Sequence, residues 1–143
     1  MTDQTSVTIE VKHLSRREPL AVFEAWLNPA IAKRFLFATP EGEMVKAEID
    51  PRVGGKFIFV DRRAGQEIAH VGSYAEIDRP RRLKFGFAVP QFSAQETEVT
   101  VKIAPVDGGC EIALTHAGVL PEYAERTAQG WTMILENLDR TLG

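Results

Sequence analysis

The sequence lacks most of the features that would point to a compartment or to a macromolecular partner. Its 143 residues include one cysteine, Cys110, so no internal disulfide can form and we expect a reducing, cytoplasmic setting. No apolar run approaches the roughly 20 residues of a membrane span, and the polar N-terminus lacks the apolar core of a signal peptide. The net charge of −3 gives no general attraction to nucleic acid. We therefore expect neither a membrane nor a nucleic acid as partner.

The sequence also offers few groups for chemistry. The three histidines, His13, His70 and His116, show neither metal-ligand spacing nor a carboxylate partner nearby in the sequence, and there is no Cys-x-x-Cys motif. We expect no metal and no cofactor, and the sequence favours a protein that is not an enzyme. The lone Cys110 is expected to be a small buried apolar residue.

What the chain does have is enough apolar residues, 44%, to build the core of one domain spanning residues 1–143. Val7, Ile9 and Val11 alternate with polar residues and predict a half-buried strand. Pro19 is expected at the first position of a helix, although Ser15 and Glu18 could instead form a capping box. Asn28-Pro29 ends that helix and caps a second short one.

Six more strands are predicted, around residues 45–49, 57–60, 67–77, 83–87, 99–103 and 112–116. Their short connections imply antiparallel pairing. Pro121 opens a final helix with an apolar stripe at three- and four-residue spacing that includes Trp131, Leu135 and Leu138. The predicted fold is therefore α+β: a curved antiparallel sheet of about six or seven strands wrapped around a long C-terminal helix, with two short helices between the first two strands.

Several motifs occur in a characteristic order along this pattern. They are Val22-Phe23-Glu24-Ala25-Trp26, Asn28-Pro29, Asp50-Pro51-Arg52-Val53-Gly54-Gly55-Lys56-Phe57, Gly72-Ser73-Tyr74-Ala75-Glu76-Ile77, Pro80-Arg81-Arg82-Leu83, Leu114-Thr115-His116 and Gly130-Trp131. Together they resemble the SRPBCC (START/Bet v-like, helix-grip) superfamily, and within it the branch named after the activator of the heat-shock protein 90 ATPase. The resemblance implies the helix-grip fold and a cavity between the sheet and the long helix.

The aromatic and apolar residues that face this cavity are the candidate ligand-binding set. We predict that a ligand would contact Trp26, Phe35, Phe57, Phe59, Tyr74, Phe85, Phe87, Val99, Val101, His116, Trp131 and Leu135. Ordinary core packing is the competing interpretation for the same residues. Tyr74 or His116 could orient the ligand through a hydrogen bond, and no catalytic residue is assigned.

Three functions remain open from the sequence. The first is a protein that binds an unknown small hydrophobic molecule. The second is a co-chaperone-like interaction module with a chaperone partner, for which the arginines at 79, 81 and 82 would supply a docking patch. The third is a cyclase/aromatase-like enzyme. A homodimer through exposed sheet edges is a further expectation that the sequence does not decide.

The glycines raise two structural questions. Gly54-Gly55 is expected to form a tight structural turn between strands, with an anion-binding loop as the alternative. Asp50 is expected to fix this turn through its backbone amides, beside Arg52 at the sheet edge. Gly130 lies inside a helix, where glycine costs roughly 1 kcal/mol relative to alanine, and we expect a close approach to the sheet or to Trp131 as the reason.

Overall fold

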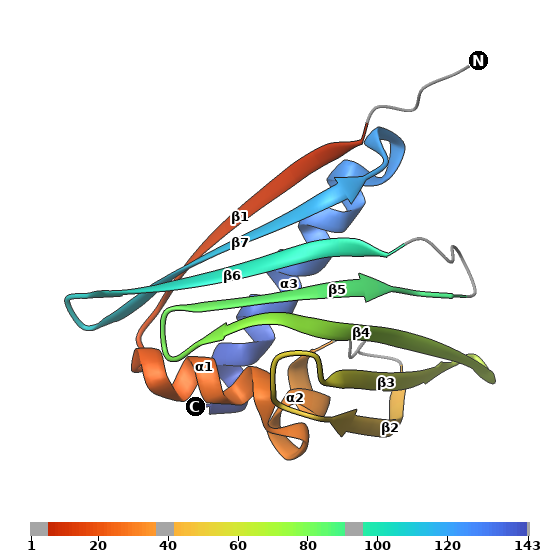
Figure 1. Cartoon of the computed structure of the whole chain (residues 1–143), viewed down its shortest axis with the longest axis horizontal. Coiled ribbons are helices and arrows are strands. Elements are labelled where there is room, and N and C mark those ends of the chain that lie inside the picture. The colour runs from red at the N-terminus through yellow and green to blue at the C-terminus, as the bar shows by residue number, and fades with distance from the viewer. Residues whose placement is uncertain (1–5, 37–41, 91–95, 143) are drawn as a thin grey trace.

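The protein is a curved seven-stranded antiparallel sheet with one long helix and two short ones. A computed structural model describes residues 6–36, 42–90 and 96–142. The sheet order is β1-β7-β6-β5-β4-β3-β2, and α3 crosses behind the strands in Figure 1. The elements are β1 (Val7–Ser15), α1 (Pro19–Leu27), α2 (Pro29–Phe35), β2 (Glu43–Ile49), β3 (Lys56–Arg63), β4 (Gln66–Asp78), β5 (Arg82–Ala88), β6 (Thr97–Val106), β7 (Gly109–Val119), the 3₁₀ turn η1 (Pro121–Tyr123) and α3 (Ala124–Leu142).

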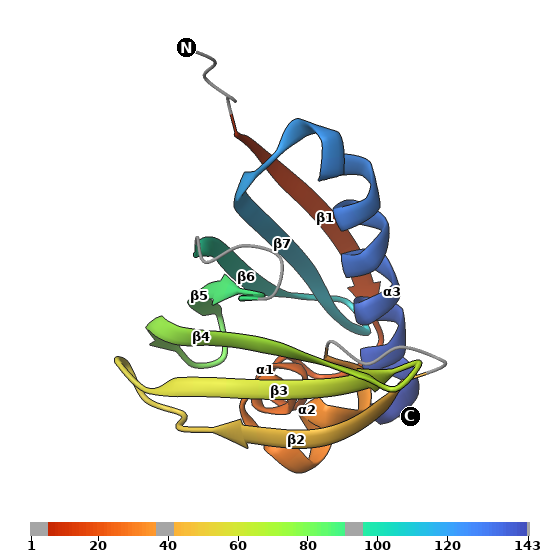
Figure 2. The same cartoon turned by 90° about the vertical axis from the view of Figure 1, so that its right-hand side faces the viewer.

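The predicted fold class is confirmed, including the antiparallel pairing of neighbouring strands. Figure 2 shows how strongly the sheet curves, with β1 and β7 upright beside α3 and with β2 and β3 turned across the lower end near α1 and α2. One face of the sheet, here called the inner face, packs on the helices. The opposite, outer face is exposed to solvent.

The two short helices begin where the prolines predict. Pro19 occupies the first turn of α1 and Glu18 is its N-cap residue, without a side-chain capping bond. The capping-box alternative is therefore wrong. Asn28 caps α2 by accepting a hydrogen bond from the Ala30 amide at 3.0 Å, as predicted. The start of the last helix differs from the prediction, because Pro121 opens the separate turn η1 and α3 begins at Ala124.

The Gly54-Gly55 turn connects β2 to β3 as a structural turn. Gly54 has φ of +85°, the left-handed region that suits glycine, and a side chain on Gly55 would lie 2.2 Å from the Asp50 carbonyl oxygen. The turn is fastened to the next strand by hydrogen bonds from the Gly54 amide to the Tyr74 carbonyl at 2.8 Å and from the Tyr74 amide to the Gly55 carbonyl at 3.0 Å. The carboxylate of Asp50 accepts a hydrogen bond from Arg52 Nε at 2.8 Å.

Gly130 corrects one prediction. A side chain built at this position in α3 meets no atom of the sheet within 4 Å, so close approach to the sheet does not explain the glycine. The structure gives no physical reason for it.

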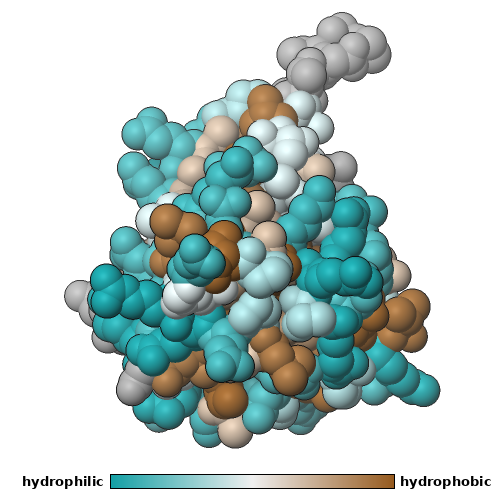
Figure 3. Space-filling view, turned by 90° about the vertical axis from the view of Figure 1, so that its left-hand side faces the viewer, coloured by the Kyte–Doolittle hydropathy of each residue, from teal (hydrophilic) through white to brown (hydrophobic). Residues whose placement is uncertain are grey.

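Figure 3 shows one side of the molecule, which is mainly hydrophilic and carries hydrophobic residues as separate spots. Among the described residues, no helix is both long and apolar enough to span a membrane. In the described part of the chain, the exposed large hydrophobic residues are Val7, Leu14, Leu20, Val45, Val53, Val106, Tyr123 and Met133.

Candidate functional site: an aromatic interior between the sheet and the long helix

Aromatic side chains from five elements meet in the interior. Trp26 of α1 lies edge-on to Phe35 of α2, with ring centroids 5.4 Å apart. It also faces Phe85 of β5 at 6.5 Å and Trp131 of α3 at 6.4 Å. Phe57 of β3 packs edge-on against Phe85 at 5.4 Å. The period of two along the strands places these rings on the inner face, so the aromatic residues form one continuous cluster.

The predicted ligand-binding residues all belong to this interior. Eleven of the twelve are buried, and Phe87 is partly buried and packs against the core. Their placement on one inner surface agrees with the sequence. Contact with a ligand remains a prediction for each of them.

A small void remains among the rings, with a volume of about 10 Å³. That is room for about one water molecule, whereas ligand pockets typically measure roughly 300–1,000 Å³. In this conformation the aromatic side chains occupy the interior. The void is lined by Trp26, Leu36, Phe57, Tyr74, Leu83 and Phe85.

His116 of β7 is the centre of a buried chain of hydrogen bonds. Trp131 Nε1 donates to His116 Nδ1 at 3.0 Å, and His116 Nε2 lies 2.7 Å from Thr97 Oγ1. Thr97 Oγ1 donates in turn to the Phe87 carbonyl at 3.1 Å, so the Nε2–H of His116 is the donor to Thr97. The ring is therefore held as the neutral Nε2–H tautomer, and both of its nitrogens are occupied.

Burial changes the acid–base behaviour of three interior side chains. It lowers the pKa of His116 to about 4 and also lowers the pKa of His70, whose ring stacks on Phe87. It raises the pKa of Tyr74, with the nearby Asp50 carboxylate adding to the effect. All three groups are uncharged at neutral pH. Because both nitrogens of His116 already have protein partners, the ring has no free atom to act as a general base on a ligand.

Thr97 is the member of this chain that the sequence analysis missed. It has the same strand parity as Val99 and Val101, so its inward direction was readable from the period of two. Its hydrogen bond to His116 depends on the β6–β7 register, in which Val99 pairs with His116. That register could not be read from the sequence alone.

A second cluster of polar residues connects β1 to α3. The Asp139 carboxylate accepts from Ser15 Oγ at 2.6 Å and lies 2.6 Å from His13 Nε2. Serine, histidine and aspartate meet here, but the carboxylate lies between the other two, so the histidine does not activate the serine. Cys110 pairs with Ser15 across the strands, and its pKa is raised by burial and by the Asp139 charge. This cluster fastens the helix to the sheet, and Cys110 is buried as predicted.

The arginines of the predicted docking patch are all paired with carboxylates. Arg79 Nε binds Glu24 of α1 at 2.6 Å, and its guanidinium lies 5.8 Å from the Phe23 ring centroid. Arg82 Nε lies 3.0 Å from Glu76. Arg81 pairs with Asp78 at 3.3 Å. The Arg79–Glu24 contact attaches the β4–β5 turn to α1, and the three pairs together neutralise much of the charge of the turn.

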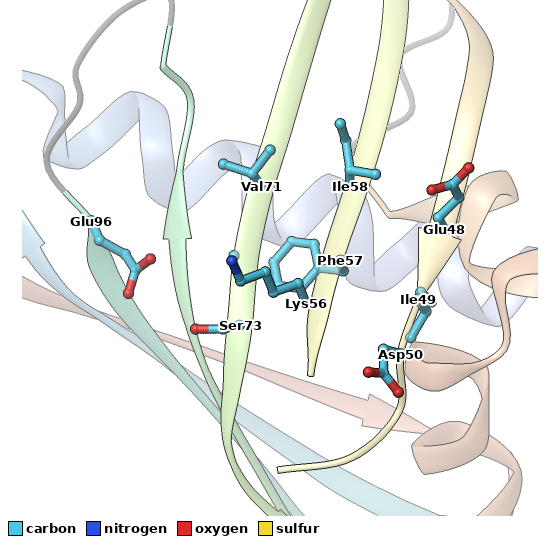
Figure 4. A pocket seen from close by; sticks show the side chains of 10 residues that line it. Glu48, Ile49, Asp50, Lys56, Phe57, Ile58, Val71, Ser73 and Glu96 are labelled. Atoms are coloured by element: carbon cyan, nitrogen blue, oxygen red, sulfur yellow. The ribbon is translucent and has the colours of Figure 1, made fainter. Parts of the chain in front are cut away.

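A larger pocket of about 600 Å³ opens on the outer face of β2, β3 and β4. Ile58 and Val71 form an apolar floor beside the Phe57 ring. Lys56 lies in the middle, with Ser73 and Glu96 to one side and Glu48 to the other (Figure 4). Of the predicted ligand-binding residues, Phe57 also lines this outer pocket, and the other residues of the pocket were not predicted. Within the described part of the chain, no group of three or more His, Cys, Asp or Glu side chains could hold a metal ion, at this pocket or elsewhere.

The curved sheet, the long C-terminal helix and the two short helices after the first strand define a helix-grip protein of the SRPBCC class. Residues 16–143 match the family described as Activator of Hsp90 ATPase homolog 1-like protein, and the chain belongs to this family. No curated protein matches the sequence.

Solved structures share the fold at low sequence identity. A protein of unknown function from Staphylococcus aureus superimposes with a TM-score of 0.84 and 19% identity over 96% of this chain and 93% of the other. An AHSA1-like protein from Aeromonas hydrophila gives a TM-score of 0.82 with 23% identity, covering 95% and 92% of the two chains. A protein from Chromobacterium violaceum gives 0.82 with 21% identity, covering 93% and 94%. At this level of identity the similarity establishes the fold alone.

Proposed function

We propose that this protein binds a small hydrophobic molecule between the curved sheet and α3. The proposal rests on one observation, which is that side chains and not backbone fill the space between α3 and the middle of the sheet. The backbone of α3 packs most closely on β1 and α2. Towards β5, the space beside α3 is occupied by aromatic side chains, with Trp131 packed against Trp26 and Phe87. A ligand can therefore enter here only if some of these side chains move out of the interior.

The energetics of such binding follow from apolar burial. A ligand that buries about 200 Å² of apolar surface gains about 5 kcal/mol, from which the cost of reordering the displaced side chains is subtracted. The interior offers aromatic faces and buried groups that are uncharged at neutral pH in His70, Tyr74 and His116. An ionised ligand would lose its hydration there without a partner. The interior is therefore suited to an uncharged, largely apolar molecule.

Native mass spectrometry of freshly purified protein tests the proposal and reports the oligomeric state, including any homodimer, in the same spectrum. We expect one small molecule per chain, released on denaturation. The same protein is then titrated with the fluorescent apolar probe N-phenyl-1-naphthylamine. A spectrum that shows only protein without a bound small molecule, together with no binding of the probe, would contradict the proposal.

Two matched variants locate the site. Leu83→Phe adds volume next to the interior void, and we expect it to weaken probe binding about ten-fold. Val71→Ile adds one methyl group to the floor of the outer pocket and should leave the affinity unchanged. The opposite pattern would place the ligand in the outer pocket.

A second candidate function is an interaction with a chaperone ATPase, which the family description favours. The outer sheet face and the β4–β5 turn would carry it. The pairing of Arg79, Arg81 and Arg82 with carboxylates leaves few free cations for an acidic partner. Stimulation of the ATPase rate of a heat-shock protein 90 by the purified chain would support this function, and an unchanged rate would exclude it.

A further inference from the structure

The indole N–H of Trp26 is a buried donor without a partner. We infer that it recognises a hydrogen-bond acceptor on the ligand, so that the ligand is a neutral apolar molecule carrying such an acceptor. This inference rests on the proposed function and deepens it. Trp26 is 1% exposed, and its Nε1 has no hydrogen-bond partner in the structure. Buried donors in folded proteins are nearly always paired, because leaving one unpaired in an apolar interior is costly.

The second tryptophan shows the contrast. The Trp131 ring lies 6.4 Å from that of Trp26 in the same cluster, and its Nε1 donates to His116. The protein thus satisfies one of its two interior indoles with its own histidine and leaves the other unsatisfied. The difference singles out Trp26 as a group that a bound molecule can satisfy.

The location of Trp26 supports the same conclusion. It borders the void of about 10 Å³ among the interior rings, next to Tyr74 and Phe85. Tyr74 also lines the void, and burial keeps its phenol protonated. The surface of the void is entirely apolar, which suits the apolar body of a ligand, and the unpaired indole N–H belongs to a ring that borders it, so a ligand that pushes the rings apart can bring an acceptor to this donor.

The chemistry of these groups narrows the ligand class. An indole N–H can donate but cannot accept, so it selects a ketone, ester, ether or heteroaromatic nitrogen. The six residues that line the void carry no charge, so a carboxylate or an ammonium group would be left without a counter-ion. The acceptor is therefore neutral.

The test uses two probes of nearly the same shape, 1-indanone and indane, which differ by one carbonyl group. Each is titrated into ¹⁵N-labelled protein while the side-chain indole N–H signals are followed. The sequence contains two tryptophans, and Trp26→Phe assigns the signals while keeping an aromatic ring at the position. We expect 1-indanone to bind about five-fold more tightly than indane. The Trp26 signal should move downfield, the Trp131 signal should shift much less, and the preference should disappear in Trp26→Phe.

The outcomes separate the inference from the proposed function. Equal binding of the two probes, with the Trp26 signal unmoved, overturns the inference and leaves hydrophobic binding in place. It would mean that a retained water satisfies the indole. Failure of both probes to bind the wild-type protein overturns the proposed function and this inference with it. If Trp26→Phe does not fold, the signals and the two affinities in the wild-type protein still decide between these outcomes.

Discussion

At the scale of single residues, His116 determines how the interior responds to acid. Its Nδ1 accepts a hydrogen bond from Trp131, and a proton on that nitrogen would face another donor. Burial disfavours the charged ring and lowers the pKa of His116 in the folded state to about 4 from the ordinary 6.5. The unfolded chain therefore binds the proton more readily than the folded chain.

This difference in proton affinity between the unfolded and folded chains determines how stability depends on pH. The contribution of His116 is fully present above pH 6.5 and is lost as the pH falls towards 4, by about 3 kcal/mol in all. His70, whose pKa is also lowered, acts in the same direction. In His116→Gln the amide can accept from Trp131 and donate to Thr97 without titrating. Urea unfolding from pH 7.5 to 4 should show a shallower loss of stability in the variant, and equal slopes would contradict the assignment.

Two glycines test the packing of the sheet and of the helix. A side chain on Gly72 would lie 1.9 Å from the Gly86 carbonyl oxygen and 2.5 Å from the Phe57 ring, whereas one on Gly130 meets open space. Gly72→Ala should lower the free energy of unfolding by about 2–4 kcal/mol, because the backbone around Gly86 has to move to make room for the methyl group. Gly130→Ala should raise it by roughly 0.5–1 kcal/mol through helix propensity. Chemical denaturation of both variants measures the difference, and effects of the same sign would be inconsistent with this packing.

At the scale of elements, the connection between β1 and α3 depends on Asp139. Asp139→Asn removes the charge that binds Ser15 and His13 while keeping the shape. We expect a loss of about 1–3 kcal/mol of stability. Glu136→Gln, an exposed change of the same kind three residues earlier on α3, is the control and should be nearly neutral. Similar losses in both variants would show that general charge on the helix, and not this cluster, is responsible.

The order and type of the elements could be predicted from the sequence because each has a local cause. Alternating apolar residues predict the strands, Pro19 and Asn28 mark the two short helices, and the Gly54-Gly55 turn requires a left-handed backbone. The residues that face the interior could also be predicted, because side chains alternate along a strand and each points either inward or outward.

The polar contacts of the interior could not be predicted in the same way. The meeting of Thr97 with His116, and of Asp139 with Ser15, depends on strand register and on the position of α3 along the sheet. These are tertiary properties with no local signal. For Gly130 the error was of the opposite kind. The cost of glycine inside a helix suggested a close contact with the sheet, and the fold does not make that contact.

At the scale of the whole molecule, the two faces of the sheet offer two different environments. The inner face is aromatic and closed around a small void, and the outer face carries an open pocket with charged walls. We expect the hydrophobic ligand to bind on the inner face, between the sheet and α3. Because side chains on one strand alternate between the faces, methyl groups of residues on either side of the sheet can report which face is occupied.

The most direct test is a set of intermolecular NOEs between N-phenyl-1-naphthylamine and methyl groups of the labelled protein. Val99, Val101 and Leu135 are buried in the interior, whereas Ile58 and Val71 form the floor of the outer pocket. If the ligand binds in the interior, we expect NOEs from the probe to the interior methyl groups and none to Ile58 or Val71. NOEs confined to Ile58 and Val71 would contradict it and would assign the binding site to the outer face of the sheet.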